Sequence, residues 1–319
     1  MRIRYLLTIC MWLTFRSLLN AQGIPAGYYD ETAGLTGQQL KTALHQIIKN
    51  HSVISYTGLW TAFYTTDDKP TGKGWGIYSD NPDGTPPYEF SFGTNQCSTT
   101  PGFEGSCYNR EHTFSASWFG GSTSDTIYTD LFHLLPADSY VNSRRSNYPY
   151  GEVSASTWTS QNGSKLGPCS CPGYSGTVFE PLDAYKGDLA RHYFYLATRY
   201  ESEIAGWETI SSMGDAVMNG TSFPCFEPWF LNMLGEWHMA DPVSQKEIDR
   251  NNTIYNDFQH NRNPYIDHPE YVYAVWGIGE PVILPEPGNY PTDFSARHIH
   301  LQWSDATGTV LPTGYLIRM

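Results

Sequence analysis

Hydrophobic residues recur at helical spacing in four segments of the chain, separated by polar segments rich in Gly and Pro. Apolar side chains spaced three and four residues apart lie on one face of a helix, so each recurrence predicts a helix that buries one face. The four predicted helices cover residues 37–50, 186–204, 228–239 and 242–258.

Capping residues define the starts of two of these helices. Thr36 and Gln39 have the spacing of a capping box before the first helix. Asp241 as N-cap and Pro242 at the first helical position predict the start of the fourth. Residues 55–63 combine aromatic and branched side chains, and fit either a short helix or a strand.

The segments between these elements contain many turn-forming residues. Residues 72–105 are predicted to be loops around short strands such as 75–78, and residues 153–176 to be a surface excursion. Pro264 and Pro269 cannot continue a helix, so we expect the compact unit to end close to them.

The C-terminal part has a different pattern. Residues 281–293 form a proline-rich linker after a domain that covers residues 22–280. Residues 294–303 alternate like a strand, and residues 313–318 look like the next one. This C-terminal β segment, 294–319, resembles the start of a fibronectin-like β-sandwich.

The first 21 residues have the features of a secretory signal peptide. Arg2 and Arg4 precede an apolar run over residues 5–13, and residues 19–21 form a small-residue cleavage site. We therefore expect a secreted protein of bacterial type, extracellular or periplasmic. No later run is long and apolar enough to span a bilayer, and the expected oligomeric state is a monomer.

Composition is that of a packed globular protein. Of the 319 residues, 40% are hydrophobic and 15% aromatic, which is enough for a large core. The formal net charge is −13, and removing the three arginines of the predicted signal takes it to −16. That charge argues against a non-specific nucleic-acid binder, although a divalent cation with a few arginines can hold a phosphate inside an acidic protein.

Export permits disulfide bonds. Cys97 and Cys107 bracket a Thr/Pro/Gly loop, and we pair them. Cys169, Cys171 and Cys225 are an odd number whose pairing stays open. A zinc site at Cys169 and Cys171 has no convincing second half.

The chemistry is concentrated in residues 109–151, which fit a strand, loop, strand and helix. Glu111 and His112 are adjacent near the start, and Asn142 lies in the first turns of a helix that begins between residues 136 and 139. Neighbouring side chains on a strand point to opposite faces. Glu111 and His112 can serve one site only if the strand ends or bends at His112.

These three groups suit phosphodiester hydrolysis. That reaction needs an activated water and cationic stabilisation of the developing charge. A neutral His is a suitable base near pH 7, and a carboxylate with an amide oxygen is a credible protein share of a magnesium shell. The structural alternatives are that Glu111 and His112 are a surface pair and that Asn142 caps or covers a helix.

Longer motifs resemble one family. They lie in collinear blocks over roughly residues 24–276 and look like the bacterial endonuclease I family of His-Me finger (ββα-metal) nucleases. The blocks are Asn109–His112, Asp130–Pro136, Val141–Gly151, Phe179–Pro181, Lys186–Arg191, Tyr195–Tyr200, Trp237–His238, Asp241–Val243 and Asn261–Pro269.

The resemblance implies roles for individual residues. His112 would be the general base, and Glu111 and Asn142 would ligate one divalent ion, Mg²⁺ with Mn²⁺ or Ca²⁺ as alternatives. That ion would bind a non-bridging phosphate oxygen and stabilise the leaving 3′ oxygen. The products would carry 5′-phosphates, and DNA, with RNA as a further substrate, would be cut with little sequence preference because contacts go to the backbone.

The arginine that stabilises the phosphate is left open. Arg110 and Arg145 are candidate phosphate contacts, and each is equally suited to a structural salt bridge. Some relatives place an arginine and a further glutamate in the loop after the base. Residues 118–129 here contain no basic residue, and Tyr128 stands about where that glutamate would be, so Arg110, Arg144 and Arg145 compete for the role.

The remaining polar residues of the motifs have structural interpretations. Asp130 and His133, which begin the second predicted strand, are expected to brace the site. His268 fits a turn lock, and His238 fits a helix-end contact. For these two residues and for His260, the alternative is contact with substrate or metal.

The sequence therefore predicts a secreted α+β nuclease with a ββα-metal core, surrounding helices and a C-terminal β tail. Two alternatives remain. One is another metal-dependent phosphodiesterase or phosphatase, and the other is a non-catalytic extracellular binding module on the same fold.

Overall fold

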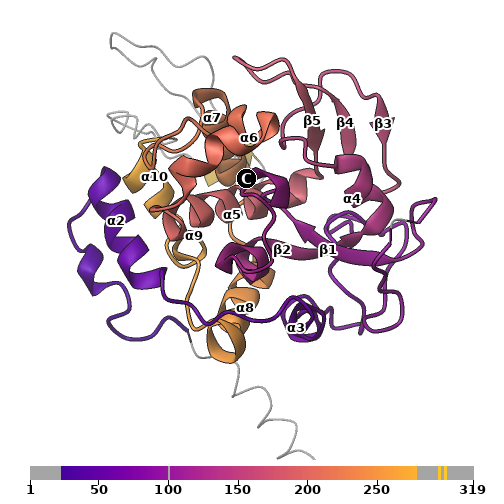
Figure 1. Cartoon of the computed structure of the whole chain (residues 1–319), viewed down its shortest axis with the longest axis horizontal. Coiled ribbons are helices and arrows are strands. Elements are labelled where there is room, and N and C mark those ends of the chain that lie inside the picture. The colour runs from indigo at the N-terminus through magenta and orange to yellow at the C-terminus, as the bar shows by residue number, and fades with distance from the viewer. Residues whose placement is uncertain (1–22, 100, 279–293, 296–297, 300–319) are drawn as a thin grey trace, which may run out of the picture. The chain divides into compact units, whose positions relative to one another are not determined.

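Figure 1 shows the computed structural model of the chain, which describes residues 23–99, 101–278, 294–295 and 298–299. These residues belong to two compact units, 1–278 and 279–319. The first unit combines helices with small antiparallel sheets, which confirms the α+β class. The predicted signal peptide and the predicted proline-rich linker lie outside the described residues.

A hairpin followed by a helix forms the part that carries the motifs. Strands β1 (Tyr108–His112) and β2 (Leu134–Asp138) pair antiparallel, with His112 opposite Leu134. Helix α4 (Ser139–Arg145) follows at once, because the Asp138 carboxylate accepts hydrogen bonds from the first backbone N–H groups of the helix. The predicted order of strand, loop, strand and helix is confirmed.

The loop between the two strands contains three short 3₁₀ helices, Ala116–Trp118, Thr126–Thr129 and Leu131–His133. Asp130 and His133 were expected to begin the second strand, but β2 starts only at Leu134. The Asp130 carboxylate accepts from Phe132 N at 3.0 Å, and this closes a turn that an extended strand would not allow.

Helix α5 (Lys186–Arg199) runs through the middle of the unit, and all of its residues are buried. It packs against α2 (Gly37–Ile48), α7 (Pro228–Ala240) and α9 (Pro264–Asp267), and α10 (Tyr271–Trp276) covers α2. Three predicted helices are confirmed here, although the Thr36 side chain makes no cap hydrogen bond. The prolines near the C-terminal end precede or open the short helices α9 and α10, which the sequence did not predict.

The fourth predicted helix starts later than expected. Helix α8 (Gln245–Thr253) has Ser244 as N-cap, in a capping box with Glu247, and continues as a π-helical turn over Ile254–Phe258. Asp241 does not cap it, because its carboxylate accepts from Gly187 N at 2.9 Å on α5. A tertiary contact therefore overrides the local capping signal.

A three-stranded antiparallel sheet lies beside α4 (Figure 1). Its strands are β3 (Trp158–Thr159), β4 (Lys165–Pro168) and β5 (Thr177–Glu180), in that spatial order. The surface excursion predicted for residues 153–176 thus contains two of the strands. The short strand predicted for residues 75–78 is absent from the described structure, where a turn covers residues 77–79.

The other described elements are short. Residues 55–63 take the helical alternative, as α3 (Gly58–Thr66). The rest are 3₁₀ helices at Asp30–Thr32, Asp183–Tyr185 and Ile204–Ile210, and α6 (Ser212–Asp215).

The predicted disulfide between Cys97 and Cys107 is confirmed, with a Cα–Cα distance of 5.8 Å. Cys169 and Cys171 form a second disulfide, and Cys225 is buried and free. No group of three or more His, Cys, Asp or Glu side chains suited to a metal occurs in the described part of the chain.

In the second unit, strands β6 (Phe294–Ser295) and β7 (His298–Ile299) pair antiparallel with each other. The run over residues 294–303 is therefore not one continuous strand, and its remainder lies outside the described residues. None of the described helices is long and apolar enough to cross a membrane.

Candidate active site

Glu111 is a buried carboxylate held at one oxygen. Its Oε1 accepts from the hydroxyls of Tyr78 at 2.9 Å and Tyr150 at 3.3 Å, and Arg145 Nη1 lies 3.1 Å away. The two tyrosine oxygens also lie 2.6 Å apart, and because each hydroxyl carries one proton, two of these three contacts are hydrogen bonds at any one time. Burial raises the pKa of Glu111, against the opposing effect of Arg145 and the hydroxyls. Oε2 makes no hydrogen bond within the described structure.

His112 is fixed by a backbone carbonyl. Its Nε2 lies 3.0 Å from the carbonyl oxygen of Tyr128, so Nε2 carries the proton and donates it. Nδ1 therefore keeps its lone pair. Nδ1 of His133 is fully enclosed without a partner, whereas Nδ1 of His112 is not fully enclosed. Burial is the main cause that lowers the pKa of His112 to about 3, so the ring is neutral at pH 7.

Glu111 and His112 point to opposite sides of β1. Glu111 packs toward α4, whereas the His112 ring lies among Tyr56, Phe119 and Tyr128. Strand β1 ends at His112, as a site shared by the two side chains requires. The shared site would then lie at the end of the strand, with Glu111 on one side of β1 and His112 on the other.

Asn142 lies over the same face of β1 as Glu111. Its Nδ2 donates to Asn109 Oδ1 at 2.9 Å, and Asn109 is two residues from Glu111 along the strand. The Oδ1 atom of Asn142 has no hydrogen-bond partner among the described residues. An amide oxygen and a carboxylate oxygen are thus both uncommitted on this face, and these are donors that a hard divalent cation prefers.

Arg145 is enclosed, with 1% of its surface exposed. Its Nη1 donates to the backbone oxygen of His112 at 3.0 Å, and Nη2 donates to that of Thr113 at 2.7 Å. With the Glu111 contact, this guanidinium joins α4 to the end of β1. The geometry is that of the structural salt bridge, the alternative that the sequence left open.

Arg110 lies on the same side of β1 as His112, two residues away. Its guanidinium carbon is 3.4 Å from the ring centroid of Tyr56 and 4.2 Å from that of Trp60. Nη1 donates to Tyr56 O at 2.6 Å, while Nη2 makes no hydrogen bond within the described residues and is not fully enclosed. Arg110 therefore keeps a donor group available near the neutral histidine.

The other motif residues have structural partners. Asp130 accepts from Tyr195 and Tyr200 at 2.8 and 2.9 Å, and His133 Nε2 lies 2.7 Å from a backbone oxygen. His238 is in the last turn of α7, with Nε2 at 3.1 Å from Pro269 O. His260 and His268 pair with Tyr255 O at 2.8 Å and Glu270 at 3.0 Å.

Sequence reasoning missed the groups that hold Glu111 and His112. Tyr78 lies in a segment predicted to be loops and strands, and no local pattern marks its hydroxyl as a partner of Glu111. Tyr150 lies inside the motif at Val141–Gly151, so the motif could have identified it as a partner of Glu111. The Tyr128 carbonyl is a backbone group, which no side-chain pattern can identify.

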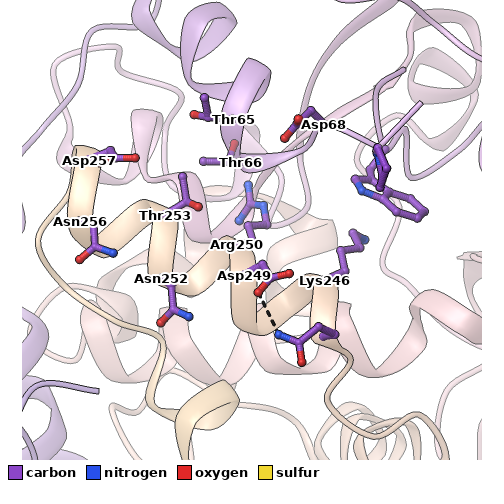
Figure 2. A pocket seen from close by; sticks show the side chains of 13 residues that line it. Thr65, Thr66, Asp68, Lys246, Asp249, Arg250, Asn252, Thr253, Asn256 and Asp257 are labelled. Atoms are coloured by element: carbon purple, nitrogen blue, oxygen red, sulfur yellow. Dashed lines mark hydrogen bonds between the residues drawn. The ribbon is translucent and has the colours of Figure 1, made fainter. Parts of the chain in front are cut away.

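A polar groove of about 790 Å³ between α3 and α8 is separate from these residues (Figure 2). Asp68, Asp249 and Asp257 line it, and Gln245 donates to Asp249 at 2.9 Å. Its two cationic residues, Arg250 and Lys246, are paired with Asp67 at 2.9 Å and with Asp188 at 3.2 Å. An acidic lining with a neutralised arginine is a poor phosphate site.

The comparisons with known proteins place the chain among enzymes that hydrolyse phosphodiester bonds. The model of the endonuclease I family matches residues 36–270, which is more than half of the chain. The chain belongs to the endonuclease I family.

Curated relatives agree with this assignment. The chain is 37% identical over 253 residues to a protein named extracellular ribonuclease from Bacillus amyloliquefaciens, and 35% identical to one of the same name from Bacillus subtilis. Each match covers 78% of this chain and 78% of the relative. A protein named endonuclease-1 from Buchnera aphidicola is 28% identical over 132 residues, covering 41% of this chain and 51% of the relative.

Proposed function

We propose that the protein is a secreted, metal-dependent endonuclease that cuts DNA and RNA with little sequence preference and leaves 5′-phosphates. The observation that carries the proposal is the pair of uncommitted oxygens of Glu111 and Asn142 at the end of the strand that bears a neutral His112. The order β1, β2 and α4 is that of a ββα-metal core, and we assign the core to this class.

Glu111 and Asn142 are the proposed ligands of one divalent ion, most simply Mg²⁺, with Mn²⁺ or Ca²⁺ as alternatives. When bound there, such an ion would supply positive charge to a phosphate oxygen and to the leaving 3′ oxygen. Tyr78, Tyr150 and Arg145 hold Oε1 of Glu111 and leave Oε2 free for it.

His112 is the proposed general base. The Tyr128 carbonyl fixes the proton on Nε2, so Nδ1 is the atom that takes a proton from the attacking water. Because burial keeps the ring neutral, Nδ1 is ready to accept at pH 7.

Arg110 is the proposed phosphate contact, because its Nη2 is uncommitted and it lies on the His112 side of β1. We assign Arg145 a positioning role, since its hydrogen bonds and its ion pair are all to residues at the strand end.

The names of the relatives bear on substrate and location. Two are called extracellular ribonucleases, which supports RNA as a substrate and agrees with the predicted signal peptide. One is called an endonuclease, the activity expected for DNA.

The test is a cleavage assay on supercoiled plasmid and on a long unstructured RNA, with Mg²⁺ and with EDTA. Wild-type protein with metal should nick and then degrade the plasmid and shorten the RNA. His112→Ala should lower the rate by roughly 100-fold or more, the size of a general-base contribution. Asp257→Asn, in the polar groove, is the matched control and should cleave like wild type.

Intact plasmid and RNA across several divalent ions would contradict the nuclease and leave the binding-module alternative. Cleavage of p-nitrophenyl phosphate without cleavage of either polymer would favour the phosphatase alternative. Full activity of His112→Ala would reassign the base.

A further inference from the structure

Most of the arginines that the structure describes are neutralised by a carboxylate. Within residues 23–278, four arginines pair with Asp or Glu, and three do not: Arg110, Arg144 and Arg199. Arg199 is buried and donates to His51 at 2.9 Å. Arg144 is the exposed member of the three, and the proposed mechanism leaves it unused.

Arg144 packs against an aromatic side chain from another element. Its guanidinium carbon lies 5.4 Å from the ring centroid of Trp158, and the ring of Tyr140 lies 6.5 Å from that of Trp158. Trp158 is half-buried on β3, an edge strand of its sheet, among exposed small residues at 154–157 and 159. We name Tyr140, Arg144 and Trp158 the Trp158 patch.

The Trp158 patch adjoins the proposed metal ligands. Tyr140 and Arg144 are one helical turn apart on α4, and Asn142 lies between them in sequence. Asn142 faces β1, whereas Tyr140 and Arg144 face Trp158 (Figure 1 shows α4 between the two sheets). One turn of helix rises about 5.4 Å, so the patch is within reach of a nucleotide next to the cleaved bond.

A half-buried tryptophan beside an arginine that has no carboxylate partner among the described residues fits an unpaired nucleotide. The base stacks on the ring, and the guanidinium attracts the phosphate of the same strand. Bases in a duplex cannot use such a ring, because neighbouring base pairs cover their faces.

We propose that the Trp158 patch binds an unpaired nucleotide adjacent to the cleaved bond, so that the enzyme favours single-stranded nucleic acid. This inference rests on the proposed function and names the form of its substrate. Duplex DNA would be held through its backbone alone and therefore more weakly.

The experiment measures binding without cleavage. A fluorescein-labelled 10-mer DNA and its blunt duplex are titrated in EDTA, with anisotropy as the readout and a gel to check that the DNA is intact. The wild type should bind the single strand more tightly than the duplex. Trp158→Ala should weaken single-strand binding by roughly 5- to 100-fold, the value of one stacked base, and change duplex binding less than 2-fold.

Two further variants separate stacking from charge. Trp158→Phe should keep most of the single-strand affinity, because it keeps a ring. Arg144→Ala should reduce the slope of log affinity against log salt by about 0.7, which is one phosphate contact on a single strand.

Tyr255→Ala is the matched control. Tyr255 also lies under a guanidinium, that of Arg262 at 5.5 Å, but Arg262 is paired with Asp267. This variant should bind both DNA forms like wild type.

Wild-type single-strand affinity in a Trp158→Ala protein that melts like wild type would overturn the inference and leave the nuclease function intact. Equal loss for single strand and duplex would also overturn it. If the wild type binds neither form and leaves plasmid intact with metal, the proposed function fails together with it.

Discussion

A buried carboxylate can ligate a metal only if one of its oxygens is held in place and the other is left without a hydrogen-bond partner. Glu111 meets both conditions, because Tyr78, Tyr150 and Arg145 all contact Oε1 and none contacts Oε2. The hydroxyl oxygens of Tyr78 and Tyr150 lie 2.6 Å apart, so each fixes the position of the other. The pair sets the direction in which Glu111 presents its second oxygen.

Removing these hydroxyls should weaken metal binding with little effect on the fold. We expect the double variant Tyr78→Phe, Tyr150→Phe to bind Mn²⁺ roughly tenfold more weakly, the usual cost of losing groups that orient a ligand. Calorimetric titration of the protein without nucleic acid measures this. Tyr185→Phe is the control, because Tyr185 makes a similar buried bond to Asp80 at 2.6 Å, and its loss should leave the affinity unchanged.

The C-terminal end of helix α4 is joined to the end of β1 by the side chain of Arg145. Arg145 binds the carbonyls of His112 and Thr113, so the guanidinium closes the strand end at the point where β1 stops pairing. Buried carbonyls need donors. Tyr193 also donates to Thr113 O at 2.9 Å, and among the described residues Arg145 is the side chain that donates to both carbonyls. Arg145 was one of three arginines that competed for the phosphate, with a structural salt bridge as the alternative, and its contacts fit that alternative by joining the helix to the strand.

Arg145→Ala should be strongly destabilising. The substitution leaves Glu111 as a buried carboxylate without its cation, which costs about 3–5 kcal/mol. Urea unfolding followed by far-UV circular dichroism gives the difference. Arg144→Ala, one residue away but exposed, should stay within about 0.5 kcal/mol of wild type. Similar stability of the two variants would contradict the joining role.

At the level of the compact unit, buried histidines connect segments that are far apart in sequence. His238 on α7 donates to Pro269 O at 3.1 Å, and its Nδ1 faces Arg191 Nη1 of α5 at 3.4 Å. The ring must be neutral to accept from a guanidinium. Burial, together with Arg191, lowers the pKa of His238 to about 4.

This pKa predicts acid sensitivity with a definite sign. The unfolded histidine titrates near 6.5 and the folded one near 4, so the unfolded state binds more protons between these values. Stability should fall as pH drops from about 6.5 to 4, by about 3 kcal/mol for this residue, and level off below. His238→Gln keeps a donor for Pro269 O and should have a shallower slope there.

Urea unfolding at a series of pH values tests this acid sensitivity. From pH 7 to 9 the free energies of unfolding of the variant and the wild type should change with pH in the same way. Equal slopes of this free energy against pH below pH 6.5 would contradict the role of His238. His51, His133 and His192 are also buried with lowered pKa values, so some acid sensitivity remains in the variant.

Local patterns in the chain were sufficient for a large part of the architecture. The helices α2, α5 and α7 follow from apolar spacing, because burying one face of a helix leaves a 3.6-residue period in any context. The unit of β1, β2 and α4 and the Cys97–Cys107 disulfide were predicted too. The motifs identified the family, and the candidate residues Glu111, Asn142 and Arg145 do meet on one face of β1.

Contacts between distant segments decided the rest. The start of α8 moved from Asp241 to Ser244 because the Asp241 carboxylate is taken by α5. Strands β3–β5 are too short to leave a readable alternation, so only pairing reveals them.

The motif at residues 109–151 determined which residue types are present, but only packing determined which of their atoms are free. Tyr78 holds Glu111, Asn109 holds Asn142, and the Tyr128 carbonyl holds His112, and each contact leaves one atom of its partner uncommitted. Local periodicity does not predict these three contacts. The same holds for the roles of Arg110 and Arg145. The spacing of apolar residues indicates which face of a helix or strand is buried. The hydrogen-bond partners of a polar side chain depend on which distant segments lie beside it in the folded chain.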